Sequence, residues 1–107
     1  MARYELKTWT EPFQAIWDGT CTHTIRRMAR PYAIDDVLLL REYDPRRPQH
    51  YAEDRFTGRS LRVRVTYVSA PGTFGLPEEL CVMSLQVCGR LIEGDRRLPP
   101  NLDPVVS

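Results

Sequence analysis

The densest group of reactive side chains in this sequence lies in residues 19–30, which read GTCTHTIRRMAR. A thiol, an imidazole and three hydroxyls occupy five consecutive positions within it. A cysteine thiol becomes a nucleophile when a nearby cation or imidazole lowers its pKa. On a strand, side chains two positions apart share a face, so Cys21 and His23 would come within contact range. Cys21 is therefore either a nucleophile activated by such neighbours or a small, half-buried packing residue.

The best candidates for contact with phosphate are three arginines within five positions: Arg26, Arg27 and Arg30. A guanidinium group offers planar, bidentate hydrogen bonds to phosphate. When an aromatic side chain also stacks on a base, the combination holds single-stranded RNA segments. Trp9 and Tyr32 are the aromatic candidates for that stacking. The alternative is a salt-bridged surface in which these arginines pair with Asp18, Asp35 or Asp36.

Lys7 is the only lysine, and it is either an ammonium group in a pocket or a charge on an edge strand. Three glutamates beside hydrophobic runs are candidates for a pocket carboxylate, although exposed glutamates beside turns are the commoner case: Glu42, Glu78 and Glu79. The three cysteines have no metal-ligand spacing: Cys21, Cys81 and Cys88. We therefore expect reduced thiols, no disulfide framework, no metal site and no cofactor.

The composition is that of a single globular domain. The chain has 107 residues, of which 42% are hydrophobic and 27% are charged, with a formal net charge of +1. A net charge this small argues against indiscriminate binding of polyanions. No apolar run approaches the roughly 20 residues that span a bilayer, and the first residues lack the apolar centre of a signal peptide. We therefore expect a cytoplasmic protein with no membrane partner.

The elements that position these residues follow from the spacing of apolar side chains. Residues Tyr4–Lys7 predict a short strand, and Thr10 is expected to be the N-cap of a helix that follows it. The apolar residues of that helix share one face: Phe13, Ile16 and Trp17. Gly19 is placed to end the helix with a positive φ. We expect this helix to lie across a sheet with its aromatic face inward, which leaves Trp9 exposed.

Three further segments have the alternation or the continuous apolar character of strands: Val37–Tyr43, Leu61–Tyr67 and Leu80–Cys88. The first two are expected to pair as a hairpin across the loop between them. One short helix among several strands, joined by Gly and Pro turns, predicts a mostly β (α+β) fold, a small barrel with an accessory helix. Residues 93–107 are rich in proline and charge, so we expect a loosely packed or disordered tail after a domain of residues 1–92.

The segment that begins at Gly19 resembles the signature of ASCH domains, small barrels of the PUA-like superfamily associated with RNA and modified nucleosides. The signature is G-x-K-x-x-E-x-R; Gly19 and Arg26 match it, whereas Cys21 stands at the lysine position and Thr24 at the glutamate position. In the subgroup of amidohydrolases that act on N4-acetylated cytidine, the segment is similar to G-x-K-T-x-T-x-R. Thr22, Thr24 and Arg26 match this version, and Cys21 departs from it.

The resemblance extends over residues 3–88 to a small, uncharacterised ASCH-related branch. The shared segments are, in chain order, LKTW with Phe13, RR with Arg30, IDD, LREYDP, FTGR, RVTYV, FGL and VMSL. Residues 48–54 look like an insertion relative to that branch. The resemblance implies a small PUA-like pseudo-β-barrel in which one short N-terminal helix covers a cleft.

The resemblance also implies a ligand, which is an RNA segment or a modified nucleoside or nucleotide. The expected cleft residues are Lys7, Trp9, Cys21, Thr24, Arg26 and Arg30, with Arg27 beside them. Because the signature lysine would help to activate the threonine, its absence favours binding without turnover. The alternative is an amidohydrolase of N4-acylated cytidine with Thr24 or Cys21 as nucleophile. A third interpretation is a protein–protein interaction module from a mobile element, which would use residues 46–55 and the tail.

Overall fold

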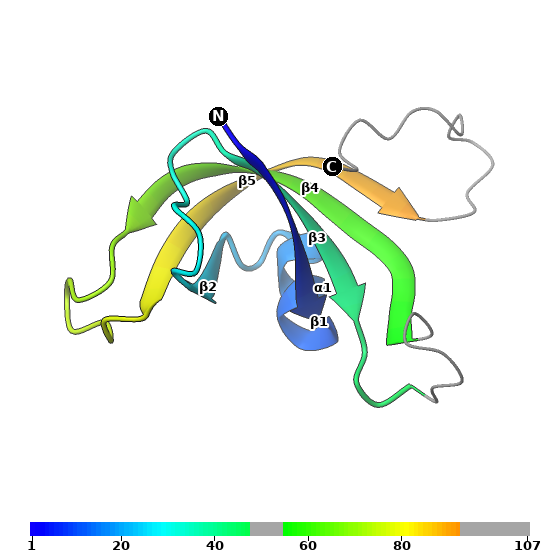
Figure 1. Ribbon diagram of the computed structural model, residues 1–107. Helices are drawn as coiled ribbons and strands as arrows, with labels where there is room; N and C mark the ends of the chain where they lie inside the picture. The colour runs from blue at the N-terminus through cyan, green and yellow to red at the C-terminus, as the bar shows by residue number, and fades with distance from the viewer. Residues whose placement is uncertain (48–54, 93–107) are drawn as a thin grey trace.

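A single curled sheet of five strands forms the body of the domain in the computed structural model, which describes residues 1–47 and 55–92 (Figure 1). The elements in chain order are β1 (Arg3–Trp9), α1 (Thr10–Asp18), β2 (His23–Arg27), β3 (Val37–Tyr43), β4 (Phe56–Ser69) and β5 (Leu80–Ile92). The expectation of a mostly β fold with one short helix is confirmed.

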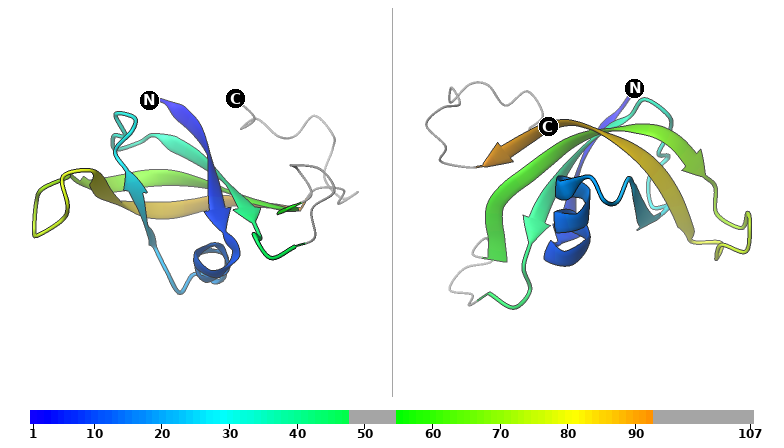
Figure 2. Two further views of the ribbon diagram at one scale, coloured as in Figure 1. Left: turned by 60° about the horizontal axis from the view of Figure 1, so that its bottom comes forward. Right: turned by 180° about the vertical axis from the view of Figure 1, so that it is seen from behind.

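The strand order in the sheet is β1-β3-β4-β5-β2, so β1 and β2 are its two edges although only α1 and a short turn separate them in sequence. β1 pairs in parallel with β3, and the other pairs are antiparallel. Register shifts within β4 and β5 accompany the curvature of the sheet, as bulges commonly do. The sheet arches over α1, with β2 returning beside the helix under the same arch (Figure 2).

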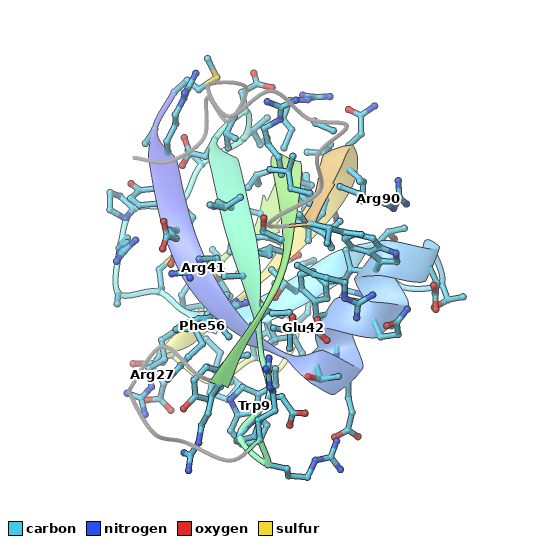
Figure 3. The ribbon with its side chains drawn as sticks, turned by 90° about the vertical axis from the view of Figure 1, so that its right-hand side faces the viewer. Trp9, Arg27, Arg41, Glu42, Phe56 and Arg90 are labelled. Carbon is cyan, nitrogen blue, oxygen red and sulfur yellow. The ribbon has the colours of Figure 1, made fainter. Side chains whose placement is uncertain are left out.

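Alternation along the strands divides their side chains between the concave face, which looks toward α1, and the outer face. On β3, Leu38, Leu40 and Glu42 are buried on the concave side. Arg41 lies on the outer face, away from the helix, as does Phe56 of β4 (Figure 3). The two-residue period assigns the faces between the register shifts.

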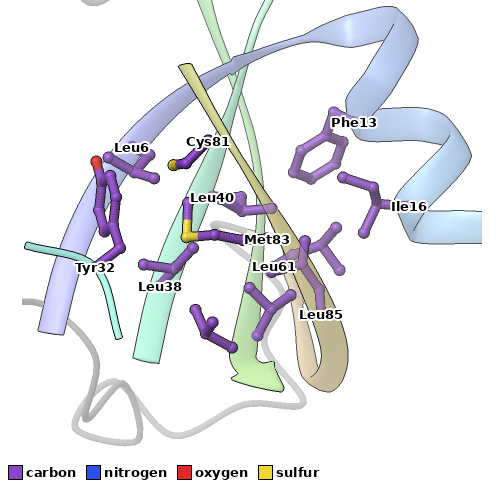
Figure 4. Packing of buried hydrophobic residues seen from close by; sticks show 12 residues of the cluster. Leu6, Phe13, Ile16, Tyr32, Leu38, Leu40, Leu61, Cys81, Met83 and Leu85 are labelled. Carbon is purple, nitrogen blue, oxygen red and sulfur yellow. The ribbon is translucent and has the colours of Figure 1, made fainter. Parts of the chain in front are cut away.

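The hydrophobic core fills the space between the concave face and α1 (Figure 4). Phe13 and Ile16 of the helix are almost completely buried, as the helical spacing predicted. They pack with side chains that alternate along the three central strands: Leu38, Leu40, Leu61, Val63, Val65, Cys81, Met83 and Leu85. Trp17 is half-buried at the edge of this cluster. The predicted inward aromatic face of the helix is confirmed.

The ends of α1 differ in how well the sequence predicted them. The expectation that Thr10 caps the helix is wrong, because Trp9 occupies the cap position and β1 runs into the helix without a connecting residue. At the other end, Gly19 has φ 83°, and its amide donates to the carbonyl of Ile16 at 3.1 Å. This is the left-handed helix end that glycine favours, as predicted.

The predicted strands are present, and most are longer than the apolar patterns indicated. Val37–Tyr43 coincides with β3, and its hairpin with β4 is confirmed. The segments Leu61–Tyr67 and Leu80–Cys88 are the central parts of β4 and β5. The apparent insertion at residues 48–54 and the tail at 93–107 lie outside the described residues. No helix in the described ranges is long and apolar enough to cross a membrane.

Candidate functional site

A pocket of about 410 Å³ lies between the two edges of the curled sheet. Its lining comes from the end of β1, the first turn of α1 and the segment around β2: Lys7, Thr8, Trp9, Pro12, Cys21, His23, Thr24, Ile25 and Arg26. Five of the residues expected from the sequence therefore border one pocket: Lys7, Trp9, Cys21, Thr24 and Arg26. Thr8, Pro12 and Ile25 were not predicted, although the alternation along β1 places Thr8 on the same inward face as Leu6.

Arg26 spans the gap between the two edge strands. From β2, its Nη1 donates to the main-chain oxygen of Lys7 at 2.8 Å, and its Nη2 donates to Thr8 Oγ1 at 2.6 Å, both on β1. Its Nε donates to Thr24 Oγ1 on its own strand at 3.2 Å. β1 and β2 are not neighbours in the sheet, so the guanidinium group joins them where no strand pairing does.

The Arg26 guanidinium is a partly buried cation in the lining of the pocket. Burial lowers the pKa of Arg26, against a smaller opposing effect of Tyr32. An arginine remains charged in proteins and carries five N–H donors. Thr8, Lys7 and Thr24 take three of these donors within the described part of the chain. The other two N–H groups have no acceptor among the described residues.

Thr24 is buried, and its hydroxyl accepts the hydrogen bond from Arg26 while keeping its own proton for donation. A threonine needs an adjacent base to act as a nucleophile. Among the described residues, no carboxylate lines this pocket. The imidazole of His23, the other base in the lining, contacts Cys21, and the described residues show no hydrogen bond between it and Thr24. The surroundings of Thr24 therefore suit a hydrogen-bond donor better than a nucleophile.

Cys21 and His23 both line the pocket and are in contact, as expected, although Cys21 lies just before β2 rather than on a strand. The distance between Cys21 Sγ and His23 Nδ1 is 3.6 Å, and Sγ also donates to the main-chain oxygen of His23 at 3.3 Å. Cys21 is half-buried, and His23 is exposed. A thiol in contact with an imidazole is an arrangement that nucleophilic catalysis by cysteine uses.

A family model described as a domain of unknown function, DUF3850, matches residues 3–85. The chain belongs to the DUF3850 family. The matched range contains every residue that lines the pocket. No curated protein matches the chain.

Trp9 and Lys7 form the rim of the pocket in this DUF3850 domain. Trp9 is 57% exposed, as the sequence predicted. The ammonium group of Lys7 does not point into the pocket, since its Nζ lies 4.5 Å from the ring centre of Tyr43 on the outer face. Of the two interpretations of Lys7, the structure favours the charge on an edge strand. Lys7 contacts Arg26 through its main-chain oxygen, which accepts the hydrogen bond from Nη1.

Two of the predicted arginines lie elsewhere in the DUF3850 domain. Arg27 is exposed on β2, and neither it nor Arg30 lines the pocket, so the expectation that Arg30 belongs to the cleft is wrong. The Arg30 guanidinium lies 5.1 Å from the ring centre of Tyr4. Tyr32 is buried in edge-to-face contact with Tyr4, which excludes it as a stacking platform. Its burial raises its pKa, while Arg30 and Arg26 act in the opposite direction.

The acidic residues proposed as partners for these arginines are engaged elsewhere. Asp35 pairs with Arg64 at 2.6 Å. The two carboxylate oxygens of Asp36 accept main-chain amides, one from Ala2 and one from Ala33, each at 2.8 Å. Asp18 accepts a hydrogen bond from Gln14 of the same helix at 3.0 Å. The salt-bridged alternative with these aspartates is therefore wrong.

Glu42 is buried and does not line the pocket, and it forms a bidentate pair with Arg59 at 2.8 and 2.9 Å. Thr57 also donates to it, and Arg59 donates to Gln14 of the helix at 2.6 Å. Burial alone raises the pKa of Glu42, but the hydrogen bonds from Arg59 and Thr57 and the charge of Arg59 together lower it. Glu42 thus connects the helix to the sheet. The other candidate carboxylates are exposed before β5 and do not line the pocket: Glu78 and Glu79.

Proposed function

We propose that this DUF3850 domain is an ASCH-like, PUA-like module that binds an RNA segment or a modified nucleoside in the pocket between β1 and β2. The observation that carries the proposal is the combination of one exposed indole and one partly buried guanidinium in the lining of the same pocket. A base can stack on Trp9 while an exocyclic oxygen or a phosphate accepts the two remaining Arg26 donors.

The size and lining of the pocket support the same ligand class. A volume of about 410 Å³ lies within the range of small-molecule sites, roughly 300–1,000 Å³. The lining combines apolar surface from Pro12 and Ile25 with a small number of directed polar groups. Thr24 contributes a hydroxyl donor, and Arg26 contributes a charge that a neutral apolar ligand would leave unused.

The resemblance to the ASCH signature supports the position of the site. Thr24 and Arg26, which match the amidohydrolase version of that signature, face the pocket, and Cys21 stands beside them where the signature has lysine. We propose binding without turnover, because the described lining holds neither a carboxylate nor the ammonium group of Lys7.

A thermal-shift titration tests the proposal. The ligands are cytidine, N4-acetylcytidine, their 5′-monophosphates and short single-stranded RNA. A ligand that binds only the native state at a hundredfold excess over its dissociation constant stabilises the domain by about 2.7 kcal/mol. We expect a shift with at least one of these ligands that Thr24→Val reduces and the exposed control Arg27→Ala does not. A folded protein that shows no shift with any of them would refute the proposal.

The contact between Cys21 and His23 favours a second candidate, amidohydrolysis of an N4-acylated cytidine. In this step His23 takes the thiol proton, the thiolate attacks the acyl carbon, and the amine leaves with a proton. Water then cleaves the thioester to release acetate. Acetate release that disappears in Cys21→Ser and His23→Ala would support it. Turnover that survives in Cys21→Ser and is lost in Thr24→Ala would assign the nucleophile to Thr24 instead.

A further inference from the structure

Three aromatic side chains form a row across the outer face of three neighbouring strands. In the strand register Trp9 of β1 lies opposite Tyr43 of β3, and Tyr43 lies opposite Phe56 of β4. The rings of Tyr43 and Phe56 are 5.1 Å apart between centres and meet edge to face. Neighbouring strands are about 4.8 Å apart, so the register places Trp9 beside Tyr43, although among the described residues only the rings of Tyr43 and Phe56 are in contact.

A row of charged side chains lies next to the aromatic row on the same face. Lys7 lies opposite Arg41 in the register. Lys7 Nζ is 4.5 Å from the centre of the Tyr43 ring, and the Arg41 guanidinium carbon is 4.1 Å from the centre of the Phe56 ring. Glu5 pairs with Arg41 at 3.1 Å, and both side chains are about one-third exposed. Among the described residues, no carboxylate pairs with Lys7.

We propose that these two rows are the path of a single-stranded nucleic acid that extends from the pocket, and we call them the outer-face strip (Trp9, Tyr43, Phe56, Lys7 and Arg41). The inference rests on the proposed function, because the strand is anchored by the nucleotide in the pocket. Trp9 and Lys7 border both the pocket and the outer-face strip, which makes the two surfaces continuous. The proposed ligand is therefore an oligonucleotide rather than a free nucleoside.

The chemistry of the strip fits a single strand. Cation–π contacts near the surface are weak, so Lys7 can exchange the ring of Tyr43 for a phosphate. Arg41 can exchange the ring of Phe56 for a phosphate while it keeps its ion pair with Glu5 through another N–H group. The ring faces that they vacate are then open to bases, and stacking on aromatic side chains tolerates any base sequence. A duplex hides the faces of its bases and cannot stack in this way. Trp9 is the most exposed ring of the row and the first that a strand leaving the pocket would meet.

Affinity as a function of oligonucleotide length tests the inference. Fluorescence anisotropy of labelled single-stranded RNA would be compared with competition by the corresponding mononucleotide. The variants are Arg41→Gln and Phe56→Leu for the outer-face strip, Thr24→Val for the pocket, and Arg90→Gln as a control near Trp17 of the helix. Circular dichroism and the Tm of each variant would establish that it is folded.

For the wild type, we expect affinity to rise at least about fivefold for each added base that stacks. Arg41→Gln and Phe56→Leu should remove most of this gain and leave mononucleotide binding unchanged, whereas Thr24→Val should weaken both ligands alike. Arg41→Gln should also reduce the slope of log affinity against log salt by about 0.7, the value for one phosphate contact to a single strand. Arg90→Gln should change neither the gain in affinity with length nor the dependence of affinity on salt.

Affinity that does not depend on length would overturn the inference and leave the pocket proposal intact. A length dependence that Arg90→Gln reduces as much as Arg41→Gln would also overturn it. If no mononucleotide or oligonucleotide binds, the proposed function fails together with the inference. Binding of oligonucleotides that is sensitive to Arg41→Gln but not to Thr24→Val would retain the outer-face strip and refute the pocket as its anchor.

Discussion

Arg26 Nη2 lies 2.6 Å from Thr8 Oγ1, and this contact joins the two edge strands of the sheet. An open, curled sheet exposes unpaired main-chain groups along both edges. Here the Arg26 guanidinium on β2 donates to the main-chain oxygen of Lys7 and to the hydroxyl of Thr8, both on β1. These two hydrogen bonds connect the edges, and a third is donated to Thr24 on β2 itself. The same side chain lines the pocket. The contact between the edge strands and the ligand recognition that we propose therefore depend on one residue.

Arg26→Ala should destabilise the domain by about 2 kcal/mol, because three hydrogen bonds to a charged group are lost and Thr8 is left buried without its partner. The Tm should fall by about 10 °C. Arg27→Ala is the matched control, because it is the next residue on the same strand and is exposed. We expect the control to stay within about 0.5 kcal/mol of the wild type in urea unfolding. Equal effects of the two substitutions would show that Arg26 does not hold the edges together.

Glu42→Gln should cost roughly 3 kcal/mol at pH 7, since it leaves Arg59 without its buried counter-charge. The folded-state pKa of Glu42 lies below its ordinary value of 4.5. The stabilisation by Glu42 is therefore complete above about pH 4.5 and is lost as the pH falls through the lower, folded-state pKa. The difference in unfolding free energy between the wild type and Glu42→Gln should accordingly narrow below pH 4.5.

Glu5→Gln is the control for that experiment, because Glu5 pairs with Arg41 on the surface with both side chains about one-third exposed. Such a pair contributes about 0–1 kcal/mol, so the control should stay close to the wild type across the same pH range. A gap between wild type and Glu42→Gln that stays constant from pH 7 to pH 3 would contradict the linkage to Glu42.

Gly19→Ala should destabilise the domain by about 1 kcal/mol through the backbone alone. Gly19 has φ 83°, and a Cβ atom added there would meet no atom within 4 Å. The cost is therefore that of the left-handed conformation for a residue with a side chain. Gly19→Asn should cost less, because asparagine tolerates this conformation better. An alanine variant as stable as the wild type in thermal unfolding would show that the helix end is not held in this conformation.

The three cysteines should differ in their rate of alkylation by iodoacetamide. Cys88 is exposed, Cys21 is half-buried at the pocket mouth, and Cys81 is completely buried in the core. Burial also raises the pKa of the Cys81 thiol, against weaker effects of main-chain hydrogen bonds, which further lowers its thiolate fraction. Peptide mass spectrometry should show Cys21 and Cys88 modified in the folded protein and Cys81 only after unfolding. Fast modification of Cys81 under native conditions would contradict the packing of the core.

Local patterns in the sequence predicted the elements of the fold well. The spacing of Phe13 and Ile16 determines which face of α1 is buried, and Gly19 determines where the helix ends. Thr24 and Arg26 lie two positions apart on β2, so the alternation of strand side chains accounts for their meeting at one pocket. Cys21 precedes β2, and its place in the lining follows from the turn between α1 and β2 rather than from alternation.

What the sequence did not predict depends on pairing between distant segments. Nothing local indicates that β1 and β2 lie at opposite edges of the sheet, yet this arrangement creates the gap that becomes the pocket. The direction of the Lys7 side chain depends on the register of β1. A shift of one residue would turn the Lys7 side chain toward the inner face and the Thr8 side chain toward the outer face. The sequence offers Tyr32 as a candidate for stacking on a base, whereas the structure buries it against Tyr4, a residue 28 positions earlier in the chain.

Ligand protection of Cys21 tests the central claim most directly, because this thiol lies at the mouth of the pocket and Cys88 provides an internal reference outside it. The alkylation rates of both cysteines would be measured with and without N4-acetylcytidine monophosphate or a short single-stranded RNA. At a tenfold excess of ligand over its dissociation constant, Cys21 should react about tenfold more slowly, and the rate of Cys88 should not change. Saturable RNA or nucleotide binding that leaves the rate of Cys21 unchanged would place the ligand elsewhere and contradict the account.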